Sequence, residues 1–174
     1  EIIDNNTNNK IKNFNQNYQR EFAFIQAKFM AYTDSGVINN LKNDQKIYYD
    51  SIQLSKSGNL LESLEKINFL ISKNKNDYFI QETKADILLS YGYNKEAIKF
   101  YTKVLKAQPN NLYAKYNIFI NITLNPTENK LNKGFFLDNL DLIKYFPNNR
   151  NILIKFYDLA KLLKKNEWIL LFET

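Results

Sequence analysis

The feature that most constrains the fold of this chain is a pattern that returns after 34 residues. The first matched pair, Gly58 and Gly92, consists of identical glycines. The other pairs at this spacing are Ser63 with Ala97, Ile67 with Tyr101, Leu70 with Val104, and Lys75 with Pro109, and only the last is dissimilar in size and polarity. A repeat of this length is one supersecondary unit that cannot bury its apolar face alone, so the chain is expected to stack several of them.

Apolar spacing inside the repeats indicates helices, because large apolar residues recur at three and four positions, as in the series Leu60, Leu61, Leu64, Ile67 and Leu70. Thirty-four residues is the length of the tetratricopeptide (TPR) unit, a pair of antiparallel helices. We therefore predict an all-α fold, a TPR-like right-handed superhelix of antiparallel helix pairs with an extra N-terminal helix. The repeats are predicted at residues 44–77, 78–111, 112–149 and, in part, 150–174.

The region before the repeats has a different pattern. Residues 1–15 are rich in Asn and Lys and are predicted to form a flexible leading segment. Residues 16–43 are predicted to hold an N-terminal helix, near 16–32, and a short linker helix. The apolar residues at helical spacing in the first of these are Phe22, Phe24, Ile25, Phe29 and Met30, with Tyr18 one turn earlier.

Small residues mark the positions where paired helices are expected to approach most closely. Ser51 and Ala85 stand at this position in the first helices of two successive repeats, and Ser63 and Ala97 do so in the second helices. Gln81, in contrast, stands where large apolar residues are common, as does Lys84. The first turn of the helix after Asp77 is therefore predicted to be shifted or weakly packed.

The composition excludes several classes of chemistry. The chain contains neither cysteine nor histidine, which excludes thiol catalysis, imidazole base catalysis and zinc sites of the usual Cys/His type. It has no HExxH motif and no glycine-rich phosphate loop, and its carboxylates stand beside lysines as on solvated helix faces. We predict no catalytic residue, no metal ligand and no cofactor in this chain.

The charge distribution indicates which class of partner the chain binds. The formal net charge is +6, but 22 of the 24 basic residues are Lys, and they alternate with Asp and Glu. Nucleic-acid-binding proteins usually cluster their positive charge and use Arg for bidentate contacts. No apolar run approaches the ~20 residues needed to cross a bilayer. The predicted partner is a protein or peptide, with no nucleic acid and no membrane insertion. Because the chain begins at Glu1, we expect it to be a piece of a longer protein.

The candidate binding residues follow from the geometry of such a stack, whose inner face is lined mainly by the first helix of each pair. Four positions of each repeat point inward, and in the first repeat they are Gln45, Tyr48, Ile52 and Ser55. From the inward positions of the repeats, the predicted protein-binding residues are Tyr48, Ile52, Phe79, Glu82, Asp86, Tyr113, Tyr116 and Ile120. Aromatic residues suit a groove because they combine a large contact area with a small loss of side-chain entropy. The same rings could instead pack on the N-terminal helix or a neighbouring helix as core. The carboxylates of Glu82 and Asp86 favour a basic or neutral segment over an acidic one.

Two stretches resemble a known family. The first stretch precedes the repeats and reads Tyr18-Gln19-Arg20-Glu21-Phe22-Ala23-Phe24-Ile25-Gln26-Ala27-Lys28-Phe29. The second is in the middle repeat, which reads Asn76-Asp77-Tyr78-Phe79, then Glu82-Thr83-Lys84-Ala85-Asp86-Ile87-Leu88, Gly92 and Glu96-Ala97-Ile98. This order resembles the C-terminal region of bacterial envelope zinc metalloproteases fused to TPRs, the β-barrel assembly-enhancing protease type. In that family an Ala-Lys-containing helix precedes a repeat that opens Asn-Pro-Tyr-Phe and continues Lys-Gly-Gln-Ile-Leu. The resemblance covers residues 16–124, and it departs from the family at Ala85, where the family has glycine.

The resemblance implies a non-catalytic TPR domain that binds substrate or partner proteins, such as the cognate protease domain or unfolded outer-membrane proteins. It implies a periplasmic location and a role in outer-membrane protein quality control. Zinc would be held only in a catalytic domain outside this chain, since a chain without histidine cannot contain the family's zinc ligands. The alternative is a free-standing TPR adaptor or scaffold in secretion, pilus or envelope assembly, and a cytoplasmic location is the alternative to a periplasmic one.

Overall fold

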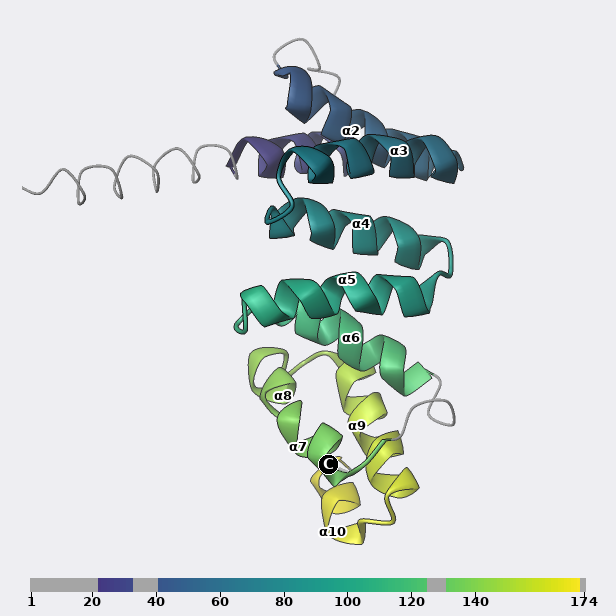
Figure 1. Cartoon of the computed structure of the whole chain (residues 1–174). Helices are drawn as coiled ribbons and strands as arrows, with labels where there is room; N and C mark the ends of the chain where they lie inside the picture. The colour runs from purple at the N-terminus through teal and green to yellow at the C-terminus, as the bar shows by residue number, and fades with distance from the viewer. Residues whose placement is uncertain (1–21, 33–40, 125–130, 173–174) are drawn as a thin grey trace, which may run out of the picture. The chain divides into compact units, whose positions relative to one another are not determined.

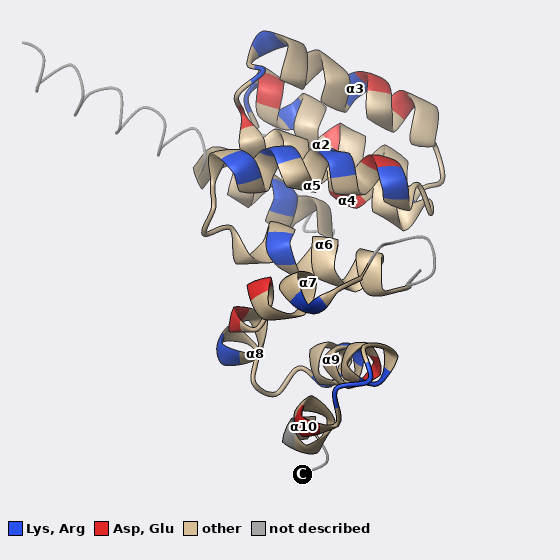
Figure 2. Ribbon diagram, turned by 60° about the horizontal axis from the view of Figure 1, so that its bottom comes forward, with Lys and Arg blue, Asp and Glu red and all other residues tan. Residues whose placement is uncertain are grey.

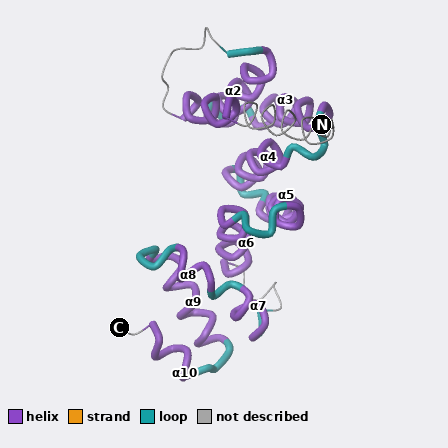
Figure 3. Tube along the Cα trace, turned by 90° about the vertical axis from the view of Figure 1, so that its left-hand side faces the viewer, coloured by secondary structure: helices purple, strands orange, loops and turns teal. Residues whose placement is uncertain are grey.

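The computed structural model describes residues 22–32, 41–124 and 131–172, and every regular element in these ranges is a helix (Figures 1 and 3). The N-terminal helix spans residues 22–32. It is followed by α2 (Asn43–Lys56), α3 (Leu60–Lys73), α4 (Tyr78–Ser90), α5 (Asn94–Ala107), α6 (Leu112–Leu124), α7 (Lys133–Asp138), α8 (Asp141–Tyr145), α9 (Arg150–Leu162), α10 (Asn166–Ile169) and the 3₁₀ helix η2 (Leu170–Phe172).

The all-α prediction is confirmed, since the described ranges contain no strand and consecutive helices pack against each other in pairs. The predicted leading segment, 1–15, lies outside the described residues. So do the first residues of the predicted N-terminal helix and the part of the predicted linker helix within 33–40.

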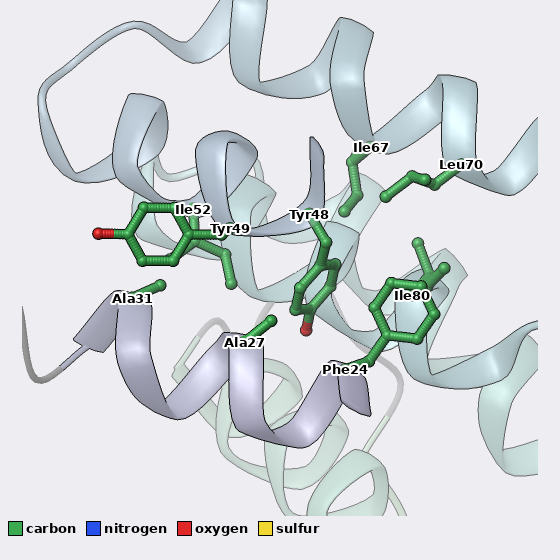
Figure 4. Close-up of a cluster of buried hydrophobic side chains, with 9 residues drawn as sticks. All are labelled: Phe24, Ala27, Ala31, Tyr48, Tyr49, Ile52, Ile67, Leu70 and Ile80. Atoms are coloured by element: carbon green, nitrogen blue, oxygen red, sulfur yellow. The ribbon is translucent and has the colours of Figure 1, made fainter. Parts of the chain in front are cut away.

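The chain divides into two compact units, which are described separately here. The N-terminal unit ends at Gly92 and the C-terminal unit begins at Tyr93. In the N-terminal unit α2 packs against α3 and α3 against α4. The core of this unit also includes residues of the N-terminal helix, and its buried apolar side chains are Phe24, Ala27, Ala31, Tyr48, Tyr49, Ile52, Ile67, Leu70 and Ile80 (Figure 4).

The two repeated glycines terminate equivalent helices. Gly58 follows α2 with φ +92°, and Gly92 follows α4 with φ +79°. Each donates its backbone N–H to the carbonyl three residues earlier, at 3.1 Å to Ser55 and 3.0 Å to Leu89. Glycine adopts this left-handed backbone without the steric cost that a Cβ would impose. The 34-residue spacing therefore marks the same turn twice.

The small residues Ser51 and Ser63 lie where α2 and α3 meet, as predicted. Ser51 of α2 and Ser63 of α3 are completely buried. The Ser63 Oγ donates a hydrogen bond of 2.7 Å to the Ser51 carbonyl, so the α3 hydroxyl reaches the α2 backbone directly. Ala85 and Ala97 are buried as well. A larger side chain at Ser51 or Ser63 would push α2 and α3 apart.

The start of α4 differs from the prediction. Gln81 is buried, and its side-chain N–H donates to the Lys75 carbonyl in the preceding loop. The Asp77 carboxylate accepts a hydrogen bond of 3.2 Å from the Ile80 backbone N–H, as an N-cap. A buried amide with a partner holds the helix to its loop, so the first turn is anchored and the expectation of weak packing is wrong.

The C-terminal unit has an aromatic core. Here α5 packs against α6, and α9 packs against α6, α7, α8, α10 and η2. The Phe119 ring stacks on Phe156 at 4.5 Å, and the Phe136 ring stacks on Trp168 at 4.2 Å. The second helix of the third repeat is two short helices instead of one. Between them Asn139 is buried, and its side-chain N–H donates to the Phe135 carbonyl at 2.7 Å.

Candidate functional site

The N-terminal helix lies across the inner positions of the first repeat. Its residues Phe24, Ala27 and Ala31 face α2, and all three are buried (Figure 4). The Phe24 ring meets Tyr48 edge-on, with ring centroids 5.2 Å apart. Tyr48 in turn contacts the Phe79 ring of α4 at 5.9 Å. The predicted inner face of the N-terminal unit is therefore covered in part by the chain's own helix.

This helix buries its small side chains and exposes several large ones. Ala27 and Ala31 lie one turn apart, so the helix can approach α2 closely. Phe22, Ile25 and Phe29 are largely exposed, at 51%, 49% and 66%. The large apolar residues that reveal the helix in the sequence thus do not all define its buried face.

The C-terminal end of this helix is fixed by two side chains of α2. The Ala31 carbonyl accepts hydrogen bonds from the Gln53 Nε2 at 2.8 Å and the Lys56 Nζ at 3.0 Å. The last carbonyls of a helix have no partner within the helix, and they carry a partial negative charge. Gln53 and Lys56 satisfy this end with a neutral and a positively charged donor.

An ion pair joins the helix to α4. The Lys28 Nζ lies 3.0 Å from the Asp86 Oδ2, and the two side chains are only 22% and 12% exposed. The same ammonium lies 5.4 Å from the centroid of the Phe79 ring. Asp86, one of the acidic residues predicted to select a basic segment, therefore binds a lysine of this chain. Glu82, the other one, is half-buried one turn earlier on α4.

Tyr48 belongs to the core of the N-terminal unit. Its hydroxyl lies 2.6 Å from the Thr83 Oγ1. The Thr83 hydroxyl can also donate to the Phe79 carbonyl, at 3.2 Å, so either hydroxyl can be the donor in the contact between Tyr48 and Thr83. Burial raises the pKa of Tyr48 well above its ordinary value, against the opposing effect of the Thr83 hydrogen bond and with a smaller contribution from the Asp86 charge. For Tyr48, and for Ile52 beside it, the structure shows packing on the N-terminal helix.

A cavity remains open where this helix ends. Its volume is about 410 Å³, and its lining residues are Tyr32, Ile52, Ser55, Lys56, Gly58, Asp86, Ile87, Ser90 and Tyr91. Ile52, Ser55 and Asp86 are inward positions of the predicted register. The Tyr91 hydroxyl donates to the Ser55 carbonyl at 2.6 Å and closes one side. Burial, followed by the charge of Asp86, raises the pKa of Tyr32, and the nearby ammonium groups of Lys28 and Lys56 oppose this shift.

The eight predicted binding residues are divided between the two units. Tyr48, Ile52, Phe79 and Asp86 come together in the N-terminal unit, beside the cavity or under the helix. Glu82 lies close enough for its charge to act on the Tyr48 hydroxyl. In the C-terminal unit, Tyr113 is 47% exposed and its ring contacts Tyr101. The Tyr116 ring packs against Phe146, and Ile120 packs against the aromatic core. Their role in binding stays a prediction.

Sequence reasoning missed Tyr32, Lys56, Ser90 and Tyr91 of the cavity. The inward register of the repeat covers only the middle of each first helix, whereas these residues lie at the ends of helices. The sequence contains one signal for this region. Ala27 and Ala31, at a spacing of four, indicate a close contact between the N-terminal helix and another helix, and Lys56 stands in the last turn of the adjacent α2.

The described residues contain no cluster of three or more acidic, histidine or cysteine side chains that could hold a metal ion. Among the described helices, none has the length and apolar character that a bilayer crossing requires. In comparisons with known proteins, neither a protein-family model nor a curated protein matched the sequence.

Proposed function

We propose that this chain is a non-catalytic, TPR-type protein-interaction domain that binds a segment of a substrate or partner protein in the N-terminal unit. The observation that carries the proposal is the 410 Å³ cavity at the end of the N-terminal helix, lined by the inward positions Ile52, Ser55 and Asp86. Pockets of about 300–1,000 Å³ with an apolar surface and a few polar groups are typical of ligand sites.

The lining of the cavity suits a short polypeptide segment. Ile52 and Ile87 supply apolar surface for one side chain. The Ser55 hydroxyl can donate to or accept from a peptide backbone, and the Ser90 hydroxyl, which donates to the Ile87 carbonyl, can accept a hydrogen bond. Asp86 and Lys56 add one charge of each sign, so a segment with an apolar side chain next to a basic or neutral residue matches this lining best.

The resemblance extends this proposal to a parent protein. It suggests a periplasmic zinc metalloprotease acting in outer-membrane protein quality control, with its catalytic domain outside this chain. The partner would then be the protease domain or an unfolded outer-membrane protein. This extension has its own test, since the gene that encodes the chain should also encode an HExxH motif. A gene without that motif would leave the interaction domain in place and reject the protease.

The binding site is tested by filling the cavity. Ser90→Trp places an indole in the cavity, and Ser72→Trp is the matched control, because each serine hydroxyl donates to the carbonyl three residues earlier in the last turn of its helix. With a labelled segment of an unfolded outer-membrane protein as ligand, Ser90→Trp should weaken binding about tenfold or more. Ser72→Trp should bind as the unmodified chain does. If both variants bind normally while folded, the cavity is not the site.

A further inference from the structure

The net charge of the molecule is confined to one unit. The N-terminal unit, residues 1–92, contains 11 basic and 11 acidic residues. The C-terminal unit, residues 93–174, contains 13 basic and 7 acidic residues, which accounts for the whole net charge of +6. A net charge on one part of a chain favours the association of that part with a partner of opposite charge.

Part of this charge forms a stripe on α5, along which Figure 2 shows several basic segments. The four lysines of the stripe, Lys95, Lys99, Lys103 and Lys106, are all exposed. With 100° per residue they fall within about 80° around the helix, and with 1.5 Å per residue they extend over roughly 16 Å. The buried residues Ala97, Tyr101 and Val104 occupy the opposite side. The stripe therefore covers the outward face of α5.

The preceding repeat shows that the stripe is not a requirement of the fold. The residues 34 positions before Lys95, Lys99 and Lys103 are Leu61, Glu65 and Phe69, which are also exposed, on α3. The buried positions stay similar between these helices, with Ser63, Ile67 and Leu70 in place of Ala97, Tyr101 and Val104. Packing thus preserves the inner face of the repeat, while the outward face of α5 has gained positive charge.

Two lysines of the stripe keep their charge without an ion pair in the part of the chain that the structure describes. Among the described residues neither Lys99 nor Lys106 forms an ion pair, and the Lys103 Nζ lies 5.0 Å from the centroid of the Phe100 ring. Glu96 is the acidic residue of α5, and it lies at the edge of the stripe. Four like charges at spacings of three and four repel each other slightly in the free chain, and an acidic partner relieves that repulsion.

We infer that the outward face of α5 is a second docking surface, which binds an acidic helical segment of a partner protein. Lysines at spacings of four stand about 6 Å apart along the helix axis, and carboxylates at the same spacing on another helix present the same steps. Interactions between charges on paired helices set partner choice in this way. This surface is separate from the cavity of the N-terminal unit and does not depend on the function proposed for that cavity.

Nucleic acids and anionic membranes fit this face less well than an acidic helix does. Single-stranded nucleic acids are bound by exposed stacking rings and Arg. α5 contains no Arg, and its aromatic ring beside the lysines, Phe100, lies next to the Lys103 ammonium. The exposed positions of α5 are Lys95, Glu96, Lys99, Lys103, Lys106 and Ala107, which offer no large apolar side chain for insertion into a lipid surface.

The test is a binding titration of the 174-residue chain with a labelled helical peptide that has Glu at every fourth position. A peptide with Gln in place of each Glu is the matched control ligand. We expect only the Glu peptide to bind, with an affinity that falls steeply between about 0.05 and 0.5 M salt. Equal binding of the Gln peptide would overturn the inference.

Charge reversal locates the surface. Lys99→Glu with Lys103→Glu should lower the affinity for the Glu peptide about tenfold or more, because each exposed ion pair contributes a factor of up to about five. Lys133→Glu with Lys144→Glu is the matched control, since it makes the same charge change at exposed positions of α7 and α8. The control should lower the affinity for the Glu peptide by less than about threefold.

Three results would overturn the inference. Equal losses in the two double variants would show that only net charge matters. Tighter binding of a single-stranded oligonucleotide or of an anionic phospholipid vesicle, lost in the α5 variant, would assign the stripe to that ligand. Circular dichroism and the milder pair Lys99→Gln and Lys103→Gln distinguish lost binding from lost folding.

Discussion

The Lys28 ammonium and the Asp86 carboxylate meet at 3.0 Å although they are 58 residues apart in the chain. This ion pair connects the N-terminal helix to α4, across an inner face that the repeat pattern predicts to be a binding surface. The chain itself thus provides an example of what this face accepts: an α-helix with alanines against α2 and a lysine against Asp86.

Lys28→Ala should lower the free energy of unfolding by about 1–2 kcal/mol, because it removes a charged partner from a largely buried carboxylate. Lys66→Ala is the control, since the Lys66 ammonium lies 3.9 Å from the Asp50 carboxylate and both side chains are more than a third exposed. The control should change stability by less than about 0.5 kcal/mol. Urea denaturation measures both, and equal effects would show that the Lys28 pair has no special role.

Ala27→Leu should destabilise the docked N-terminal helix by about 1–3 kcal/mol, because a larger side chain must enter the close contact with α2. The adjacent Gln26 is exposed, so Gln26→Leu introduces the same side chain without overpacking. Hydrogen exchange of the amides of residues 22–32 reports the docking. Faster exchange only in Ala27→Leu is the expected result, and slow exchange in both variants would mean that the contact accommodates leucine.

The buried Tyr48 should make stability depend on pH in the alkaline range. Its pKa is raised in the folded state and is near 10 in the unfolded state. Below about pH 10 both states hold the proton and the full contribution is present. Above it only the unfolded state releases the proton, so stability falls with rising pH.

Tyr48→Phe removes this dependence. The variant should lose about 1 kcal/mol near pH 7, where the hydrogen bond to Thr83 is missing. Between about pH 9 and pH 11 its stability should decline less than that of the unmodified chain. Urea denaturation at these pH values provides the comparison, and parallel declines in the two proteins would contradict the assignment.

Gly58→Ala and Gly92→Ala should each cost about 1 kcal/mol of stability. A Cβ at either position would meet no atom within 4 Å, so the cost comes from the left-handed backbone alone. Asparagine tolerates this conformation better, and Gly58→Asn and Gly92→Asn should therefore lose less. Thermal unfolding checks the order, and an alanine variant as stable as its asparagine counterpart would refute it.

The sequence was sufficient to predict the all-α fold and the turn that follows the first helix of each of two repeats. The spacing between Gly58 and Gly92 indicates equivalent turns because both require a left-handed residue. The small side chains of Ser51 and Ser63 indicate a close contact within one pair, because only small side chains fit there. These requirements are local and recur in each repeat, so they appear in the sequence as a periodic pattern of residue types.

Packing between segments that are distant in the chain produced no periodic pattern in the sequence. The N-terminal helix has apolar residues on both sides, and its buried face depends on how closely α2 can approach, which favours Ala27 and Ala31 over Phe22 and Phe29. The cavity could not be predicted either, because it lies where three helices end, beyond the register of any one of them. The outward stripe on α5 was hidden by a lysine content that is high throughout the chain.

The stacking of Trp168 on Phe136 has a practical consequence, because this is the single tryptophan of the chain. Its ring packs against the core of the C-terminal unit, so tryptophan emission reports the loosening of that unit. Tyrosines occur in both units, so they do not distinguish them, whereas circular dichroism follows the helices of the whole chain. Tryptophan emission and circular dichroism, recorded on one sample, therefore compare the melting of the C-terminal unit with that of the chain. Transitions that coincide would establish a single cooperative unit, and separate transitions would show that either half can open while the other stays intact.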